Sequence, residues 1–455
     1  MEWQRLLSNK LLGDEKSADI RLRDGRSQYQ RDFDRIVFSS AFRRLQDKTQ
    51  VFPLPENDFV HTRLTHSLEV SCVGRSLGSL VGEKVLAKHK KLSEIYSSFH
   101  FGEIVAAACL AHDIGNPPFG HSGEDAIAEF FRNNDGKNFE KEINDIKKWN
   151  DFTHFEGNAQ GFRIITKLQN KYSKGGLKLT CAVLAAFTKY PKGSIMNYES
   201  QPTGKKSKLY KKFGFFQSEK DLFKEVADET GLIQTGLQNE MSWCRHPLAF
   251  LVEAADDICY RIMDLEDGFR LGLLSFDETE NLLMPLIESK LTSYDDRDTN
   301  DKIGYLRAKA INDTVTELAD SFMENEEKIL DGKFEQDLIS VINSGEQLEL
   351  IKKISMNEIY SFRSVVEREA AGYEVLGGLL CTFINAVNET YSGNPSWKSK
   401  NLMKLLPRQF IGPDGRPDDD IYNRLLKITD FVSGMTDSYA VSLFRKIKGT
   451  SLPGR

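Results

Sequence analysis

The sequence has few cysteines and no long hydrophobic run. Its six cysteines lie far apart without a C-x-x-C pair, and most stand in apolar stretches, as buried free thiols do. The longest apolar run covers residues 104–111, whereas a membrane-spanning helix needs about 20 apolar residues. No apolar stretch of signal-peptide length opens the chain. These absences argue against a disulfide-stabilised or membrane-bound protein, and we expect a reducing, cytoplasmic location without a membrane partner.

A strong excess of charge is also missing. The 61 basic and 67 acidic side chains give a net charge of −6, which argues against a strongly cationic nucleic-acid coat but leaves room for a local basic patch. Two stretches could form such a patch: the arginine-rich first 45 residues and the lysine-rich residues 205–212. Hydrophobic residues make up 40% of the 455 residues, so the chain can bury a large core.

Apolar side chains recur at helical spacing along most of the chain, and strand-like alternation is scarce. The spacing predicts a helix from Thr62 onward, a helix over 103–112 that is buried on all sides, and a helix over 247–271. Ser122 predicts the N-cap of another helix that runs to Phe131. Further helical patterns cover residues 303–325, 334–353, 356–391 and 420–448. The expected fold class is therefore all-α.

Only eight histidines occur in the sequence, and one forms an adjacent pair with an aspartate at the end of the buried helix. His112 and Asp113 would be costly to bury unless a partner offsets their desolvation. A divalent cation is one such partner, because imidazole suits borderline transition metals and carboxylate suits harder ions. A His–Asp hydrogen bond inside the core is the other, and the pair alone does not decide between them.

Two further positions favour the metal interpretation. His66 lies three residues after Arg63, so both side chains share one face of a predicted helix. Asp256 lies in the middle of another predicted helix, where a buried carboxylate again needs a partner. Asp256, Tyr260 and Asp264 are spaced i, i+4, i+8 on a single face. For the last two taken alone, a solvated polar stripe is the simpler interpretation.

The order His66, His112-Asp113, Asp256 resembles the H…HD…D signature of HD-domain metal-dependent phosphohydrolases. Longer strings resemble the bacterial deoxyguanosine triphosphate triphosphohydrolase family, with the vertebrate dNTPase that joins a sterile-alpha-motif to an HD domain as a more distant relative. These strings are FRRLQDKTQVF (42–52), HTRLTHS (61–67), AHDIGNPPFGH (111–121), FEGNAQG (155–161) and EAADDI (253–258).

The resemblance covers residues 15–270 well and continues weakly to the string DFVSGMTD over 430–437. It implies an HD-domain helical core elaborated by a carboxy-terminal helical half. We therefore expect an HD phosphohydrolase core over 1–275, including the arginine-rich amino-terminal segment, and a carboxy-terminal helical region over 276–455 packed on that core.

The resemblance also implies a reaction, the hydrolysis of a deoxynucleoside triphosphate to a deoxynucleoside and intact inorganic triphosphate. It implies one divalent metal ion per subunit, bound by His66, His112, Asp113 and Asp256. Mn²⁺ or Mg²⁺ is the first expectation, with Fe²⁺, Co²⁺ or Ni²⁺ as alternatives, because mixed nitrogen and oxygen ligands do not select one metal strictly.

Other residues would act on the phosphates. By resemblance, His121 is the acid/base or phosphate-positioning residue and Glu124 the carboxylate that holds it, with simple helix capping as the alternative. Arg63 is the first expected phosphate contact, because a guanidinium can bind two oxygens at once. Lys212 is a weaker candidate, because a lysine run is usually a solvated loop.

The sugar would be read by a separate group of residues. By resemblance, Gln50 and Asp264 bond the 3′-hydroxyl, and Tyr260 packs where a 2′-hydroxyl would sit. Asn158 contacts the substrate or supports a residue that does. The vertebrate relative has a phosphate-binding lysine directly after the metal aspartate, whereas this chain has Asp257. Another residue must therefore take over that contact.

Two other functions fit part of the sequence. One is a different HD phosphohydrolase, such as a nucleotidase or a cyclic-nucleotide phosphodiesterase. The other is a nucleotide-sensing or single-stranded-DNA-binding protein that uses the arginine-rich and lysine-rich stretches. An activating nucleotide and a homo-oligomer, with a hexamer common in the family, are further expectations from the resemblance.

Overall fold

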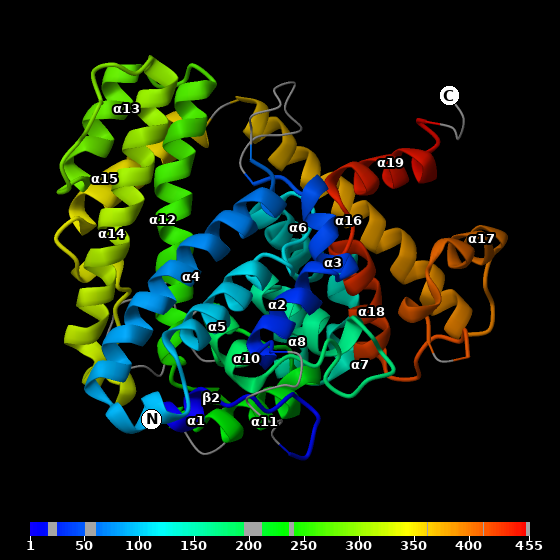
Figure 1. The fold of residues 1–455 in the computed structure, drawn as a ribbon. Helices are drawn as coiled ribbons and strands as arrows, with labels where there is room; N and C mark the ends of the chain where they lie inside the picture. The colour runs from blue at the N-terminus through cyan, green and yellow to red at the C-terminus, as the bar shows by residue number, and fades with distance from the viewer. Residues whose placement is uncertain are drawn as a thin grey trace.

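The computed structural model describes residues 1–16, 25–50, 61–194, 212–235, 241–361, 363–412 and 414–451. Its first ten α-helices build the amino-terminal part of the fold (Figure 1). They are α1 (Trp3–Leu6), α2 (Gln28–Val37), α3 (Ser40–Arg43), α4 (Arg63–Lys88), α5 (Ser98–Ala111), α6 (Gly120–Asn133), α7 (Glu140–Ile143), α8 (Ile146–Thr153), α9 (Gly157–Arg163) and α10 (Cys181–Phe187).

The remaining α-helices extend from residue 220 to residue 448. They are α11 (Lys220–Thr230), α12 (Pro247–Arg270), α13 (Phe276–Leu283), α14 (Thr299–Leu330), α15 (Gly345–Ile354), α16 (Arg363–Tyr391), α17 (Trp397–Leu405), α18 (Ile421–Ser433) and α19 (Asp437–Lys448). Within the described ranges, the strands are limited to β1 (Gln234–Thr235) and β2 (Ser242–Trp243), which pair antiparallel. The all-α prediction is confirmed.

The centre of the fold is the close pair formed by α4 and α5. Glycines let the two backbones approach: a Cβ on Gly78 would meet the carbonyl oxygen of Phe101 at 2.9 Å, and one on Gly102 would meet Ser79 Oγ at 2.3 Å. From Phe101 to Ala111, every residue of α5 except Glu103 is buried. This confirms the predicted buried helix, which delivers His112 to the protein interior.

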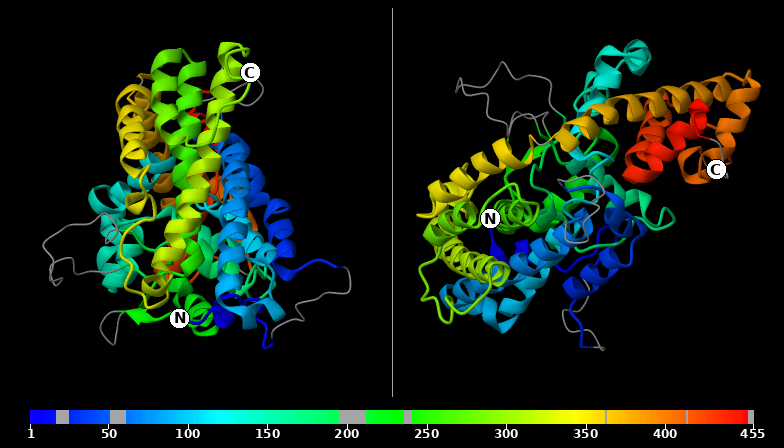
Figure 2. Two further views of the ribbon diagram at one scale, coloured as in Figure 1. Left: turned by 60° about the vertical axis from the view of Figure 1, so that its left-hand side comes forward. Right: turned by 90° about the horizontal axis from the view of Figure 1, so that it is seen from above.

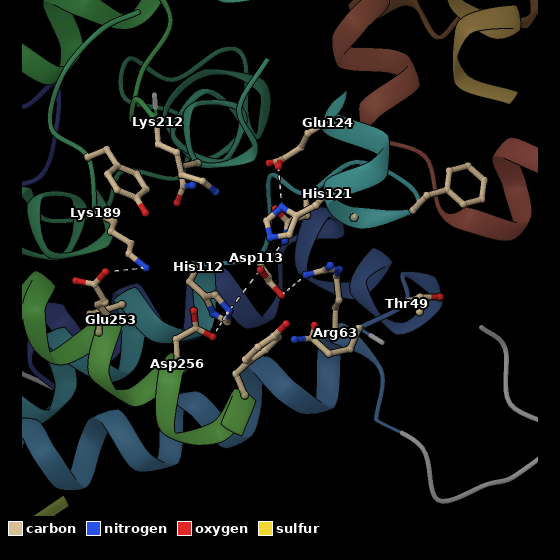
Figure 3. Close-up of a pocket in the computed structure, with 18 of the residues that line it drawn as sticks. Thr49, Arg63, His112, Asp113, His121, Glu124, Lys189, Lys212, Glu253 and Asp256 are labelled. Carbon is tan, nitrogen blue, oxygen red and sulfur yellow. Dashed lines mark hydrogen bonds and ion pairs between the residues drawn. The ribbon is translucent and has the colours of Figure 1, made fainter. Parts of the chain in front are cut away.

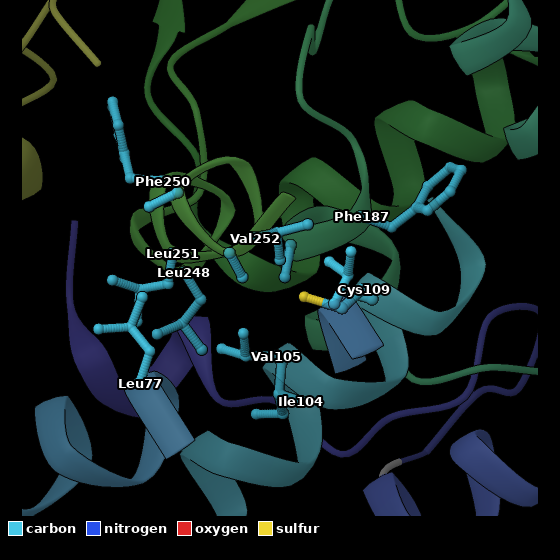
Figure 4. Close-up of a cluster of buried hydrophobic side chains, with 14 of the residues drawn as sticks. Leu77, Ile104, Val105, Cys109, Phe187, Leu248, Phe250, Leu251 and Val252 are labelled. Carbon is cyan, nitrogen blue, oxygen red and sulfur yellow. The ribbon is translucent and has the colours of Figure 1, made fainter. Parts of the chain in front are cut away.

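The helix α12 crosses this pair and completes the central core. It begins with a proline at its first position, as predicted. Figure 4 shows Leu77 of α4, Val105 and Cys109 of α5 and Leu251 of α12 converging in one cluster of buried side chains. Because three helices share this packing, the residues at their facing ends are fixed relative to one another.

The buried hydrophobic side chains form two clusters. The first joins residues between 3 and 359, and the second joins segments within 119–216 to residues 375–443. In Figure 1, α12 to α15 lie on one side of the α4–α5 pair and α17 to α19 on the other. Figure 2 shows α16 reaching between these two groups. The predicted division of the chain at residue 275 stays a prediction.

Among the described residues, α16 contains a long apolar segment. Residues 369–391 are long and apolar enough to cross a membrane by length and composition alone. Half of that window is buried inside the protein, however, and the core helix of a globular protein passes the same test.

One predicted helix is interrupted, and part of the predicted basic stretches lies outside the described residues. The helical pattern over 356–391 is interrupted, because a π-helical turn over Ser355–Ile359 precedes the start of α16 at Arg363. The lysines of the predicted single-stranded-DNA patch at 205, 206 and 208 lie outside the described residues, as do Arg21 and Arg23.

Candidate active site

Three helices bring two histidines and one aspartate to a single point. His66 lies in the first turn of α4, which Thr62 caps, while His112 ends α5 and Asp256 lies in the middle of α12. The Nε2 atoms of His66 and His112 lie 3.2 Å and 3.5 Å from Oδ1 of Asp256. One ligand atom from each residue lies within 4.8 Å of the other two.

This arrangement suits a divalent cation. Nδ1 of His112 lies 2.6 Å from the carbonyl oxygen of Cys109 and therefore donates to it, which leaves the Nε2 lone pair directed toward Asp256. Burial would raise the pKa of Asp256, but His112 and His66 together hold it below its ordinary value. The two imidazoles, which would be neutral when they bind a metal, and the carboxylate form a mixed nitrogen and oxygen donor set that suits such ions.

Asp113 stands beside this group rather than inside it. Its Oδ1 lies 3.4 Å from Nε2 of His112 and accepts a hydrogen bond from Asn116, while its Oδ2 accepts one from Nη1 of Arg63 at 2.7 Å. Burial works to raise the pKa of Asp113, but Arg63 and His112 lower it to about 2. Three of the four predicted metal ligands, His66, His112 and Asp256, thus form a tight group, with Asp113 at its edge. Figure 3 shows His112 with Asp113 and Asp256 beside it.

The segment after Asp113 turns sharply into α6. Phe119 has a left-handed backbone conformation with φ of +66°, and α6 begins directly after it at Gly120. The predicted N-cap at Ser122 is therefore wrong, because the N-cap position falls at Phe119, three residues earlier, and Ser122 lies inside the first turn. No side chain caps this helix. The turn instead depends on the left-handed backbone of Phe119, which a phenylalanine in the sequence does not predict.

The predicted acid/base pair, His121 and Glu124, lies near the start of α6. Nδ1 of His121 lies 2.8 Å from Oε2 of Glu124, and Oε1 of Glu124 accepts the backbone N–H of Gly157 at 2.6 Å. The hydrogen bond and charge of Glu124 raise the pKa of His121 above its ordinary value. Burial works to raise the pKa of Glu124, but His121 and Lys212 hold it low. The Glu124 contact therefore favours the protonated form of His121 and orients its ring.

A cavity of about 390 Å³ adjoins the group formed by His66, His112 and Asp256, which we call the metal-type group. Most of the residues predicted to bind metal or substrate, or to act in catalysis, line it. These are Gln50, Arg63, His112, Asp113, His121, Glu124, Asn158, Lys212, Asp256 and Tyr260. His66 is buried behind the wall of the cavity, with 3% of its surface exposed.

Asp264 is also absent from the lining. Its carboxylate accepts a hydrogen bond from the hydroxyl of Tyr360, and that ring stacks on Tyr260 with centroids 5.5 Å apart. Burial raises the pKa of Asp264 well above its ordinary value. Tyr360, and not Asp264, therefore presents its surface to the cavity at this end.

Sequence reasoning missed several lining residues. Lys189 is the most informative, because its Nζ lies 3.0 Å from Oε1 of Glu253, a residue that also pairs with Arg245 at 2.6 Å. Lys189 lies in a stretch whose proline and lysines indicate a loop, and nothing in that pattern places it beside α12. The other missed residues are Thr49, Asn116, Phe119, Gly120, Phe187, Tyr190, Val252, Glu253, Met356, Tyr360 and Glu369.

Two further lining residues, Lys212 and Asn158, belong to a second charged group. Nζ of Lys212 lies 3.5 Å from Oε1 of Glu156, which also accepts a hydrogen bond from Asn158 at 2.6 Å. Burial and the charge of Glu124 raise the pKa of Glu156 to about 7. Asn158 and Lys212, each predicted separately as a substrate contact, thus share Glu156 as a partner.

Comparison with known proteins agrees with this geometry. The HD domain matches residues 63–179, and a phosphohydrolase-associated domain matches residues 343–446. A deoxyguanosinetriphosphate triphosphohydrolase-like protein from Synechocystis is 47% identical over 99% of this chain and its own full length. Another from Pseudomonas aeruginosa is 42% identical over the full length of both chains.

A more distant relative is named a triphosphohydrolase rather than a triphosphohydrolase-like protein. The deoxyguanosinetriphosphate triphosphohydrolase of Enterobacter is 31% identical over 92% of this chain and 93% of its own length. The HD domain implies a divalent metal, and the chemistry of the His66, His112 and Asp256 donor atoms fits one. With full-length relatives and a matching site, the chain belongs to the deoxyguanosinetriphosphate triphosphohydrolase-like family of HD-domain phosphohydrolases and is a hydrolase.

Proposed function

We propose that this protein hydrolyses a deoxynucleoside triphosphate to the deoxynucleoside and inorganic triphosphate. One observation carries the proposal: His112 and Asp256 of the metal-type group, the His121–Glu124 pair, three cationic side chains and Tyr260 all face one cavity. The names of the relatives, which refer to deoxyguanosine triphosphate, support the same substrate class.

The divalent ion would be held by His66, His112 and Asp256, with Asp113 as a further ligand at the edge of the group. When bound, the ion would stabilise negative charge on a phosphate and make a coordinated water more acidic. Mn²⁺ or Mg²⁺ is the proposed metal, because carboxylate and imidazole ligands accept both and the substrate supplies hard phosphate oxygens.

Three cations would neutralise the triphosphate. Arg63, Lys189 and Lys212 all line the cavity, and each already faces a carboxylate, at 2.7, 3.0 and 3.5 Å. These carboxylates hold the cations in place without substrate, so little reorganisation is needed when phosphates arrive. We assign to Lys189 the contact that a lysine after the metal aspartate makes in the vertebrate relative.

His121 would move the proton. Its Nδ1 is engaged by Glu124, so Nε2 is the ring atom left to meet the substrate. From there it can protonate the departing 5′-oxygen or hold the attacking water in line. The carboxylate of Glu124 is fixed at both oxygens, which keeps the ring in one orientation.

Gln50 and Tyr260 would read the sugar. Oε1 of Gln50 is buried and has no hydrogen-bond partner among the described residues, so a sugar hydroxyl would satisfy it. Tyr260 stacks on Tyr360, and we assign to it the exclusion of a 2′-hydroxyl. Asp264 would bond the 3′-hydroxyl only after Tyr360 releases it.

The test is a product analysis. The purified protein is incubated with Mn²⁺ or Mg²⁺ and each of the four dNTPs, singly and in pairs, and the products are separated by anion-exchange chromatography. We expect deoxynucleoside and triphosphate in equal amounts. Pyrophosphate with a monophosphate would refute the regiochemistry, and faster turnover of dNMP or cyclic nucleotides would favour another HD phosphohydrolase.

Paired incubations also test the expected activating nucleotide, because a second dNTP would then raise turnover of the first. A hexameric assembly, single-stranded-DNA binding and a cytoplasmic location likewise stay predictions from the sequence.

A further inference from the structure

The turn between α18 and α19 contacts two separate segments of the candidate site. Asp437, the first residue of α19, uses both carboxylate oxygens: Oδ2 accepts the backbone N–H of Thr49 at 3.2 Å, and Oδ1 accepts that of Phe119 at 3.1 Å. Asp437 is buried, with 5% of its surface exposed. It belongs to the string over 430–437, to which the proposed function gives no role.

Each of these two N–H groups stands next to a residue of the candidate site. Thr49 directly precedes Gln50, which lines the cavity. Phe119 lies two residues before His121, and its left-handed φ of +66° is a conformation that a side chain with a Cβ adopts only under constraint. Capture of its N–H by a buried carboxylate supplies such a constraint.

Lys48 ties the same two segments to the same turn. Its Nζ donates to the backbone carbonyl of Asn116 and, at 3.1 Å, to that of Ser433. The side chain is buried, with 3% of the residue exposed. These four hydrogen bonds therefore connect three segments of the chain, which are residues 48–49, 116–119 and 433–437.

We propose that Asp437 is a positioning residue that sets Gln50 and His121 relative to each other by binding the N–H groups of Thr49 and Phe119. Its effect on turnover rests on the proposed function of those two residues. Its effect on the backbone does not, so the two can be tested separately.

The backbone test uses hydrogen–deuterium exchange of the full-length protein loaded with Mg²⁺. Pro117 and Pro118 carry no amide hydrogen, so a peptide over 116–119 reports chiefly the N–H of Phe119. In Asp437→Ala, exchange at Phe119 and Thr49 should rise at least tenfold. In Asp437→Asn, which keeps one acceptor oxygen and the side-chain shape, exchange should rise at one of the two.

The matched control is Thr436→Ala. Thr436 caps α19 through its hydroxyl, so its loss weakens the same helix without removing the Asp437 carboxylate. We expect it to lower the melting temperature while exchange at Phe119 and Thr49 stays within twofold of the wild type. Unchanged exchange in both Asp437 variants, or an equal rise in Thr436→Ala, would overturn the proposal.

The activity test is run on the same proteins. In Asp437→Asn, kcat should fall at least tenfold. The preference, measured as the ratio of kcat/KM for a dNTP to kcat/KM for the matching 2′,3′-dideoxynucleoside triphosphate, should fall at least threefold because Gln50 is displaced. Thr436→Ala should keep both within twofold. Faster exchange with unchanged kcat and preference would overturn the positioning role alone, whereas a wild-type protein without dNTP turnover would refute the proposed function alone.

Discussion

Glu124 binds the ring of His121 at Nδ1, over 2.8 Å, while its other carboxylate oxygen is fixed by the backbone N–H of Gly157. The glutamate therefore contacts His121 on its own helix and Gly157, which is distant in the sequence. Because it cannot rotate freely, it fixes the tautomer and direction of the imidazole as well as its charge. This relationship makes a pH-dependent prediction possible.

Replacing Glu124 with glutamine should move the alkaline limb of the rate profile. The hydrogen bond and charge of Glu124 raise the pKa of His121, so a neutral amide lets that pKa fall. If protonated His121 serves the reaction, activity will be lost at a lower pH, and kcat will drop by about 10²-fold. The measurement is kcat against pH for both proteins.

Asp125→Asn is the control for that measurement. Asp125 is exposed on the same helix, so its loss should leave the profile in place. An alkaline limb at the same pH in Glu124→Gln and the wild type would contradict the assigned pair.

Replacing His112 with alanine should abolish the effect of metal on stability. A ligand that binds only the folded protein raises its stability by about 2.7 kcal/mol at one hundred times its Kd. Wild-type protein should therefore melt at a higher temperature with Mn²⁺, and His112→Ala should not. His100→Ala, at the opposite end of α5, should keep the Mn²⁺ effect whatever its own melting temperature.

Much of this site could be predicted because its residues are local in the sequence. His112 follows a helix whose apolar pattern is unmistakable, and the structure buries that helix as expected. The helix that carries Asp256 likewise begins with Pro247, as predicted. Neighbouring residue types and helical spacing determine such features, so a single sequence contains them.

Other features depend on tertiary contacts that no local pattern encodes. The carboxylate of Asp264 shares a helix face with Asp256, yet Tyr360, from beyond a π-helical turn, occupies it. A π turn contains one extra residue, so the side chains that follow it no longer match the regular helical spacing used to predict them. The contact between Lys189 and Glu253 similarly joins a loop to a helix through space alone.

Replacing Lys189 with alanine should raise KM for the triphosphate. A hydrogen bond to a charged group contributes about 1.5–3 kcal/mol, which corresponds to a change of about 10- to 100-fold. The fold should survive, because Glu253 keeps its contact with Arg245 at 2.6 Å. Steady-state kinetics with the preferred dNTP measure the effect. Lys220→Ala, in the first turn of α11, is the matched control, and an equal KM in the two variants would remove Lys189 from the phosphate site.

Protonation of His246 should make the protein less stable as the pH falls below about 6.5. This residue is fully buried, and it caps α12 by accepting the N–H of Leu248 at Nδ1 while its Nε2 donates to the carbonyl of Leu6 at 3.0 Å. Burial lowers its pKa to about 4, against about 6.5 in an unfolded chain. Between those values the unfolded chain binds a proton that the folded protein excludes, so stability is complete above pH 6.5 and is lost progressively down to about pH 4. The full loss is about 3 kcal/mol, because each pKa unit corresponds to about 1.4 kcal/mol.

His246→Asn keeps a capping oxygen but cannot titrate, so its urea midpoint should vary less between pH 4 and 6.5 than that of the wild type. Parallel pH dependences in the two proteins would show that other groups cause the acid sensitivity.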